Sequence, residues 1–242
     1  MNQRAFLKAQ WEYLAMLNYE VPLEVLQPHI PPGTETDLWQ DKALVSVVGF
    51  LFNNTKVFGA RWPGHTHFEE VNLRYYVKHF DGRVWKRGVG FVSEIVPKPL
   101  IAAIANRRYN EHYSAMPMRH NISINDETIA ASYEWCYKGN WCNLGVKAEA
   151  ELQDIASGSE EEFILEHYWG YNALSSKTII EYGVEHPRWQ TYKVTEHWLN
   201  ADIATLYGKE FAPFIQDVQP VSVFLAKGSG VVIRKPRKII IE

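Results

Sequence analysis

The sequence predicts an α+β fold in which antiparallel strands dominate and curl into an open barrel or cone, with short helices at its periphery. Runs rich in Val, Ile, Phe and Tyr are separated at short intervals by Gly, Pro and Asn, a pattern typical of strands and turns. The hydrophobic periodicity predicts about ten strands and about four or five short helices. Because strands mostly follow strands, βαβ units are scarce, and one domain over residues 1–242 is expected.

The first half of the chain is expected to mix strands with short helices. Residues 6–17 carry apolar side chains at helical spacing, which favours a helix, and Pro22 starts a short helix over 22–26. The other elements expected here are a short strand over 34–40, a buried strand over 43–52, a loop over 53–67, a hairpin of strands over 68–77 and 84–94, and a helix over 99–108.

The second half is expected to be richer in strands. Ser159 followed by Glu162 forms a capping box, which predicts a helix that continues to about Tyr171. The other elements expected here are a meander of strands over 116–124, 128–138 and 141–153, strands over 179–185 and 189–198, a helix over 201–207, and a hairpin of 221–226 with 231–233 around Gly228-Ser229-Gly230.

Composition and charge narrow the class of protein. The net charge is −3, and the densest basic run, 234–238, is too short to form the basic face of a nucleic-acid-binding protein. The first eight residues do not resemble a signal peptide, and no apolar stretch approaches the roughly 20 residues that span a bilayer. Two cysteines, Cys136 and Cys142, favour free thiols in a reducing compartment. We therefore expect a cytoplasmic protein with neither a nucleic-acid nor a membrane partner.

The most informative segment is the strand expected over 68–77. Alternate residues of a strand share a face, so one face carries four polar side chains and the other an apolar set. The polar set is Glu70, Asn72, Arg74 and Tyr76, and the apolar set is Val71, Leu73, Tyr75 and Val77. The polar face is either a solvated sheet surface or the interior of a barrel. In an interior, Arg74 would bind a carboxylate in bidentate geometry, and Glu70 would act as a base or hold Arg74.

Motifs along nearly the whole chain carry a family resemblance. They are Asn18-Tyr19-x-Val21-Pro22, Phe68-x-Glu70-x-Asn72-Leu73-Arg74-x-Tyr76-Val77, Gly88-Val89-x-Phe91, Ala105-x-Arg107-x-Tyr109, Glu166-x-Tyr168-Trp169-x-Tyr171 and Val184-Glu185-His186-Pro187-x-Trp189. Their order and spacing resemble the YqjF-like family, a family of unknown function. That family is similar in fold to acetoacetate decarboxylase, which implies a β-rich cone or open barrel around a small cavity.

The resemblance also implies what chemistry to expect. Acetoacetate decarboxylase uses a Schiff-base lysine beside a second lysine, just after a helix. The matching segment here, 109–114, contains no lysine, and Lys98 at the expected helix start is interpreted as exposed. The resemblance therefore supports the fold and the cavity, and it argues against decarboxylation through an imine.

Other candidate residues have a structural and a functional interpretation. Arg107, Tyr109 and Tyr113 lie at a helix end, where cations complement the helix dipole, or they reach the mouth of the cavity. His186 before Pro187 is either a strand-end histidine or a general base and ligand contact. His65-Thr66-His67 offers too few ligands for a zinc site, and nucleotide-loop and serine-elbow motifs are missing, so no metal and no cofactor are expected.

Three hypotheses about function follow. In the first, the protein binds a small organic acid or similar polar molecule, with Arg74 as the anion anchor and Glu70, Asn72 and Tyr113 orienting the ligand. In the second, it is an enzyme on the same scaffold, with Glu70 as the acid or base of a lyase, dehydratase or proton-transfer step. In the third, it is a non-catalytic interaction protein whose barrel is filled by its own aromatic side chains. Assembly into a homo-oligomer is left open.

Overall fold

The strands of the protein form one large mixed sheet, seen in a computed structural model that describes residues 3–241. Within those residues the sheet has 14 strands, in the main order β14-β11-β10-β5-β4-β3-β1-β13-β12-β9-β8-β7, with β2 paired to β4 and β6 to β5. The strands are β1 (Ala5–Val21), β2 (Glu35–Thr36), β3 (Ala43–Val57), β4 (Phe68–Phe80), β5 (Trp85–Val96), β6 (Tyr113–Ala115), β7 (Met118–Ile124), β8 (Thr128–Tyr137), β9 (Asn140–Asp154), β10 (Trp169–Ser175), β11 (Thr178–Glu185), β12 (Gln190–Asn200), β13 (Ser222–Arg234) and β14 (Arg237–Ile240).

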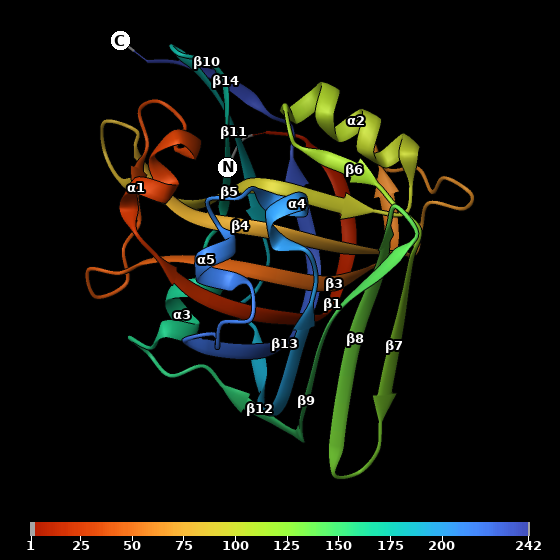
Figure 1. The fold of residues 1–242 in the computed structure, drawn as a ribbon. Helices are drawn as coiled ribbons and strands as arrows, with labels where there is room; N and C mark the ends of the chain where they lie inside the picture. Colours follow the sequence, from red (N-terminus) through yellow and green to blue (C-terminus); the bar gives the residue numbers. More distant parts are fainter. Residues whose placement is uncertain (1–2, 242) are drawn as a thin grey trace.

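Short helices lie around this sheet. They are α1 (Leu23–Leu26), a 3-10 turn (Gln27–His29), α2 (Pro99–Tyr109), α3 (Glu160–Leu165), α4 (Ile203–Tyr207) and α5 (Ala212–Ile215). Figure 1 shows α2 lying along one end of the molecule beside β6, whereas β7 and β8 extend away from it as a long hairpin. Within residues 3–241, no helix is long and apolar enough to cross a membrane. The predicted fold class, a β-rich α+β structure with short peripheral helices, is confirmed.

Seven of the described strands curl into a partial ring rather than a regular barrel. The order β11-β10-β5-β4-β3-β1-β13 returns to its start because β11 also pairs with β13. The ring is held there by a two-pair antiparallel ladder, and β10 and β5 are joined by a two-pair parallel ladder. The rest of the ring consists of long antiparallel ladders, such as that of β3 with β4.

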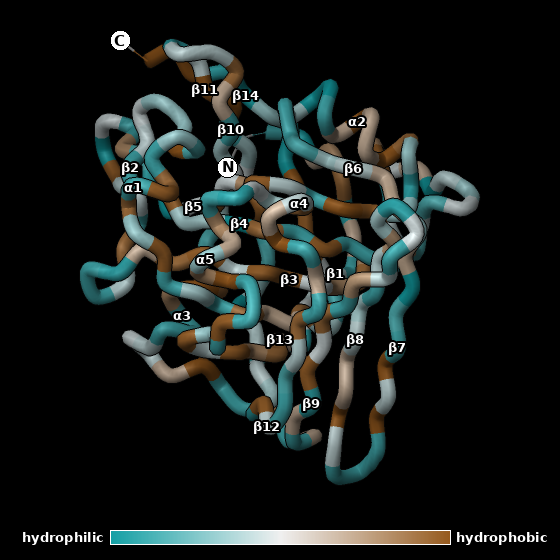
Figure 2. The backbone as a smooth tube through the Cα atoms, in the orientation of Figure 1, coloured by the Kyte–Doolittle hydropathy of each residue, from teal (hydrophilic) through white to brown (hydrophobic). Residues whose placement is uncertain are grey.

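The ring strands separate two hydrophobic layers. On β4, Val71 and Leu73 pack into the outer layer, which also contains Tyr133 and Leu144 of the β8–β9 hairpin. The inner layer lies within the ring and includes Phe50 of β3. Figure 2 shows hydrophobic stretches along the crossing ring strands and a hydrophilic tip on the β7–β8 hairpin. The opposite face of β4 therefore points into the ring.

The expected helix over residues 6–17 is wrong, because these residues belong to strand β1. Leu14, Ala15, Met16 and Leu17 are all buried: alternate side chains enter the inner and outer layers. A continuous apolar run of this kind fits a strand buried on both faces as well as it fits a helix. Pairing with β3 on one side and β13 on the other decides the outcome.

The expected hairpin around Gly228 is also wrong, because β13 runs through it as one strand. Gly228 has a φ of 80°, and a Cβ atom there would lie 2.1 Å from the Trp11 carbonyl oxygen. The glycine thus permits a close approach to β1, where Glu12 pairs with Gly228 and Leu14 with Ala226. A glycine-rich stretch marked close backbone contact instead of a turn.

Three further expectations need correction at their boundaries. The Ser159 cap is confirmed, since its hydroxyl accepts from the Glu162 N–H at 3.1 Å, but α3 ends at Leu165 and the strand β10 follows. The loop expected over 53–67 begins only after Val57, and the strand expected over 34–40 is limited to Glu35–Thr36. In each case tertiary pairing sets the boundary.

Both cysteines are free thiols. Cys142 lies opposite Trp135 in the β8–β9 ladder, whereas Cys136 lies opposite Trp141. Neighbouring residues of a strand point to opposite faces, so the two sulfur atoms lie on different faces of the hairpin.

Candidate functional site

The polar face of β4 is buried inside the ring, not exposed to solvent. Glu70 and Asn72 are 3% and 2% exposed, and Arg74 is half-buried. The strand β4 is fixed on both edges by β3 and β5, so its alternation holds these three side chains in one row. The polar face of β4 is therefore part of the interior and is not a solvated sheet surface.

Glu70 is a carboxyl group held by two donors. Asn72 Nδ2 donates to its Oε1 at 2.9 Å, and the Tyr113 hydroxyl donates to its Oε2 at 2.8 Å. Burial raises the pKa of Glu70 to about 7, against the opposing effect of these two hydrogen bonds, and the nearby Glu111 adds to the rise. Glu70 therefore exchanges its proton near neutral pH.

Two more buried carboxyl groups adjoin Glu70. Glu94 comes from β5 and Glu111 from the turn between α2 and β6, and the two carboxyl groups lie beside each other. Burial, and then the charge of Glu111, raise the pKa of Glu94 well above its usual range, and burial also raises the pKa of Glu111. The pair is therefore expected to retain a proton at neutral pH.

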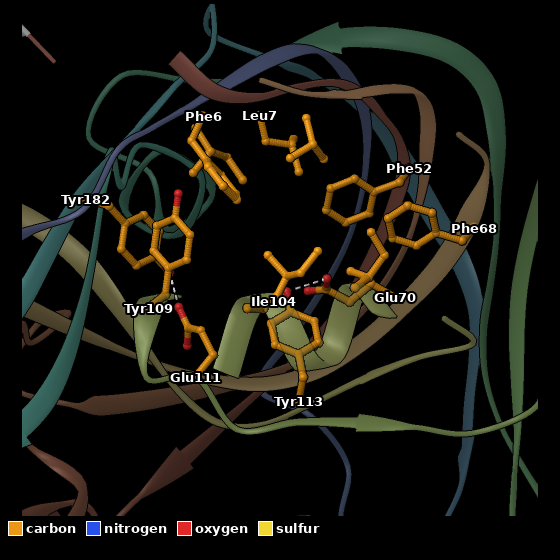
Figure 3. A pocket seen from close by; sticks show the side chains of 14 residues that line it. Phe6, Leu7, Phe52, Phe68, Glu70, Ile104, Tyr109, Glu111, Tyr113 and Tyr182 are labelled. Atoms are coloured by element: carbon orange, nitrogen blue, oxygen red, sulfur yellow. Dashed lines mark hydrogen bonds between the residues drawn. The ribbon is translucent and has the colours of Figure 1, made fainter. Parts of the chain in front are cut away.

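Tyrosine hydroxyls donate to two of the three acids. Tyr182 donates to Glu111 Oε1 at 2.6 Å, and Tyr113 donates to Glu70 Oε2 and lies beside Glu94. Figure 3 shows Glu70 with Tyr113 on one side of the cavity floor and Glu111 near Tyr182 on the other. The Oε2 atoms of Glu94 and Glu111 have no hydrogen-bond partner among residues 3–241. These atoms are free to bond a ligand or water.

These acids border a cavity with two lobes. The apolar lobe, about 80 Å³, has walls that include Phe6, Phe52, Phe68 and Ile104. Figure 3 shows Phe6 and Phe52 across the cavity from Glu111 and Tyr113. The polar lobe, about 70 Å³, is lined by residues that include Asn72, Arg74, Glu94, His167 and His186. Five residues line both lobes: Phe52, Glu70, Tyr113, Tyr182 and Ile233. Glu70 and its tyrosine partner thus lie where the two lobes meet.

Two hydrogen bonds to the protein orient the Arg74 guanidinium. Its Nη2 donates to the Ile164 carbonyl at 3.2 Å, and its Nε donates to the Tyr76 hydroxyl at 3.3 Å. Tyr76 was expected to contact a ligand, but it lines neither lobe. Its hydroxyl is buried between Arg74 and Ser46, at 2.5 Å from the Ser46 hydroxyl. Tyr76 therefore positions Arg74.

The remaining sequence-predicted residues are distributed around the cavity. Tyr109 lines the apolar lobe and donates to the Arg234 carbonyl at 3.2 Å. His186 lines the polar lobe, stacks on Trp189 with ring centres 4.0 Å apart, and has its pKa lowered by burial. Arg107 is exposed and lies outside both lobes, on the outer surface of α2.

Sequence reasoning missed Glu94, Glu111, Tyr182 and His167. Glu111 lies in the segment 109–114, where the resemblance to acetoacetate decarboxylase places the lysine pair. The buried charged group of that segment is thus a carboxyl where the resemblance leads one to expect an amine. The missing lysine was the signal: Glu111 is the acidic residue of the segment in which the resemblance places that lysine. Among the described residues that line the two lobes there is no lysine.

A second polar cluster borders the polar lobe. Arg87 Nε donates to Asp37 Oδ2 at 2.6 Å, and His167 Nε2 lies 3.2 Å from the same oxygen. Burial alone would raise the pKa of Asp37, but the hydrogen bonds from His167 and Arg87 lower it overall, whereas burial lowers the pKa of His167 to about 4. Groups of three or more residues suited to hold a metal ion are not found in residues 3–241.

Comparison with known families identifies the chain. The family model for DUF2071, described as an uncharacterized conserved protein, matches residues 8–230. The chain belongs to the DUF2071 family. No curated protein matches the sequence.

Solved structures with the acetoacetate decarboxylase fold resemble this DUF2071 protein over almost its full length. An acetoacetate decarboxylase-like enzyme from Sphingomonas wittichii RW1 is 12% identical with a TM-score of 0.67, covering 99% of this chain and 95% of that one. The acetoacetate decarboxylase of Legionella pneumophila is 12% identical with a TM-score of 0.63, covering 99% and 89%. The enduracididine biosynthesis enzyme MppR, complexed with pyruvate, is 11% identical with a TM-score of 0.64, covering 98% and 91%. At this identity the likeness establishes the fold.

Proposed function

We propose that this DUF2071 protein binds a small organic acid in the two-lobed cavity, with the carboxylate at Arg74 and Glu70. The observation that carries the proposal is the row formed on one buried face of β4, where a guanidinium and a proton-bearing carboxyl both line the polar lobe. A guanidinium pairs with a carboxylate in bidentate geometry, and a protonated Glu70 donates a further hydrogen bond. The pyruvate complex of MppR, on the same fold, supports this ligand class.

The charge of the cavity is compatible with an anion. Among the described residues that line the two lobes, Arg74 is the one lysine or arginine, whereas Glu70, Glu94 and Glu111 hold their protons at higher pH than ordinary carboxyls. A protonated acid carries no charge to repel the ligand. Affinity for a carboxylate is therefore expected to fall as pH rises through about 7, where Glu70 loses its proton.

A second candidate function is proton transfer to or from the bound acid. An acid with a pKa of about 7 is suited to general acid–base catalysis at neutral pH, and Glu70 has that pKa. Tyr113, which donates to Glu70, and the adjacent Glu94 and Glu111 offer a route for the proton away from the ligand. This candidate corresponds to the lyase, dehydratase or proton-transfer hypothesis, with Glu70 as the catalytic residue and without an imine.

Thermal unfolding in the presence of pyruvate, acetoacetate and related acids tests the binding proposal. A ligand at 100 times its Kd adds about 2.7 kcal/mol, which raises the Tm by roughly 5–10 °C for a chain of this size. We expect this shift in the wild type and in Arg119→Ala, a control that removes an exposed arginine. We expect no shift in Arg74→Ala. A shift that persists in Arg74→Ala, or no shift with any acid, would reject the proposal.

Kinetics with whichever acid binds tests the second candidate. Glu70→Gln keeps a hydrogen-bonding side chain but cannot exchange a proton, so binding should persist while turnover is lost. Turnover that survives in Glu70→Gln would rule out Glu70 as the catalytic acid or base.

A further inference from the structure

An open groove lies outside the cavity, between α2 and the segment that follows β3. Its volume is about 420 Å³, several times that of either inner lobe. Four large hydrophobic side chains line it while exposed to solvent: Phe58 at 55%, Trp62 at 52%, Leu100 at 46% and Ile104 at 36%. Such clustering of exposed apolar side chains is typical of a binding surface.

The groove continues into the apolar lobe. Four residues line both spaces: Phe6, Val57, Ile101 and Ile104. The apolar lobe in turn meets the polar lobe at Glu70 and Tyr113. A single path therefore leads from solvent, along an apolar groove and an apolar lobe, to Arg74 at its inner end.

One polar group in the groove has no partner within the described chain. Thr55 is 2% exposed and lines the groove, and its hydroxyl makes no hydrogen bond to any of residues 3–241. Buried hydroxyl groups are ordinarily satisfied, and a hydrocarbon chain has no hydrogen-bonding atom, so this hydroxyl is expected to bond water at the wall of the groove.

Cations border the outer end of the path. Arg107 and Arg108 line the groove, and neither forms an ion pair with another described residue. The Arg108 guanidinium lies 5.9 Å from the centre of the Phe58 ring, and Lys235 Nζ lies 5.5 Å from it. Positive charge at the opening attracts anions towards the path.

We propose that the groove holds the hydrocarbon part of the ligand, so that the bound acid carries an alkyl chain. This inference rests on the proposed function, because the carboxylate must sit at Arg74 for the chain to extend outward through the apolar lobe. The inner lobes, about 80 and 70 Å³, hold only a short acid, whereas the groove adds room for several methylene groups. Ligand preference by chain length is thus set by α2 and the 55–65 segment.

Calorimetric titration with straight-chain carboxylates from butanoate to dodecanoate, each below its micelle concentration, tests this. Each methylene that enters the groove should tighten binding by about fourfold until the groove is filled. In Ile104→Glu, which places a charge at the junction of groove and lobe, affinity should no longer rise with length. Ile124→Glu is the matched control, since Ile124 is 58% exposed on the distant β7–β8 hairpin, and it should keep the wild-type dependence.

The outcomes separate the two proposals. If butanoate binds but affinity does not rise with length, or rises equally in Ile104→Glu, the groove proposal fails and the proposed function stands. If no acid of any length binds, both fail. If the wild type is a dimer that dissociates in Ile104→Glu, a second copy of the chain covers the groove, and the ligand proposal is overturned. Circular dichroism of each variant establishes that it is folded.

Discussion

Two groups of buried titratable side chains border the interior of the same ring, and the pKa values of their acids are shifted in opposite directions. Asp37 has a guanidinium and an imidazole against one carboxylate oxygen, and the pKa of this acid falls below its usual value. Glu70 has only an amide and a hydroxyl as donors and other acids nearby, and its pKa rises to about 7. Burial is common to both, so the partners determine the difference.

The cluster around Asp37 stabilises the fold, whereas the cluster of Glu70, Glu94 and Glu111 is suited to proton exchange. A buried charge with a complementary partner contributes to a defined structure, whereas like charges brought together cost stability. Folding alone gives no reason to place Glu70, Glu94 and Glu111 side by side. Such an arrangement is typical of sites where a protonation state is used.

Removing Arg87, the cation that pairs with Asp37, should have the largest effect on stability. Arg87→Met leaves Asp37 with His167 as its only titratable partner, and the free energy of unfolding should fall by about 2–3 kcal/mol, since Arg87 is about one-third exposed. Urea denaturation at neutral pH measures it. Arg119→Met, which breaks an exposed pair with Glu134, should change stability by about 1 kcal/mol or less. If both variants lose the same free energy of unfolding, the Arg87–Asp37 pair stabilises the fold no more than an exposed ion pair does.

Replacing Glu70 by a neutral residue should increase stability, whereas Arg87→Met should decrease it. The pKa of Glu70 is about 7 in the folded state and 4.5 as its ordinary value, so between these pH values the unfolded chain releases the proton first. The contribution of Glu70 to stability is therefore complete below about pH 4.5 and is lost as pH rises through about 7. Glu70→Gln should flatten this decline, gaining about 2 kcal/mol relative to the wild type between about pH 5 and pH 8. Parallel stability curves for the two proteins would contradict the raised pKa.

Of the three substitutions, removing the Tyr113 hydroxyl should have the smallest effect on stability. Tyr113→Phe removes a donor to Glu70, at a cost of about 1 kcal/mol in stability. Because that hydrogen bond favours the charged form, the pKa of Glu70 should rise further above about 7. Carboxyl ¹³C NMR titration of both proteins measures the shift. A pKa that falls in Tyr113→Phe would show that the hydroxyl stabilises the protonated acid.

The sequence predicts the β4 row because a strand's alternation is local. Glu70, Asn72 and Arg74 share a face wherever the strand is placed, so only their burial had to be learned from the structure. Glu111 and Glu94 belong to different segments, and nothing in the spacing of 94 and 111 places them in contact. Their pairing depends on how α2 and β6 return to β5, which is a tertiary property.

The fold class was predictable for the same reason, and the errors fall where periodicity is uninformative. The sequence of β4 alternates polar and apolar residues, whereas β1 has a continuous apolar run that is buried on both faces and shows no period by which to recognise it. Gly228 has the chemistry of a turn residue, yet it serves a close contact between strands. Both errors arise from packing partners distant in sequence.

The pairing of β1 with β13 constrains how the protein is made. Phe6 and Leu7 of β1 and Ile233 of β13 line the apolar lobe, so the wall of the cavity joins segments more than 220 residues apart in the chain. During synthesis the β4–β5 hairpin leaves the ribosome long before β13 exists, with Glu70 and Glu94 still exposed to water as ordinary acids. The acids acquire their unusual protonation only when the last ring strand is in place, and contacts of such long sequence separation form slowly. A nascent chain therefore lacks the complete wall of this cavity until its synthesis is nearly finished.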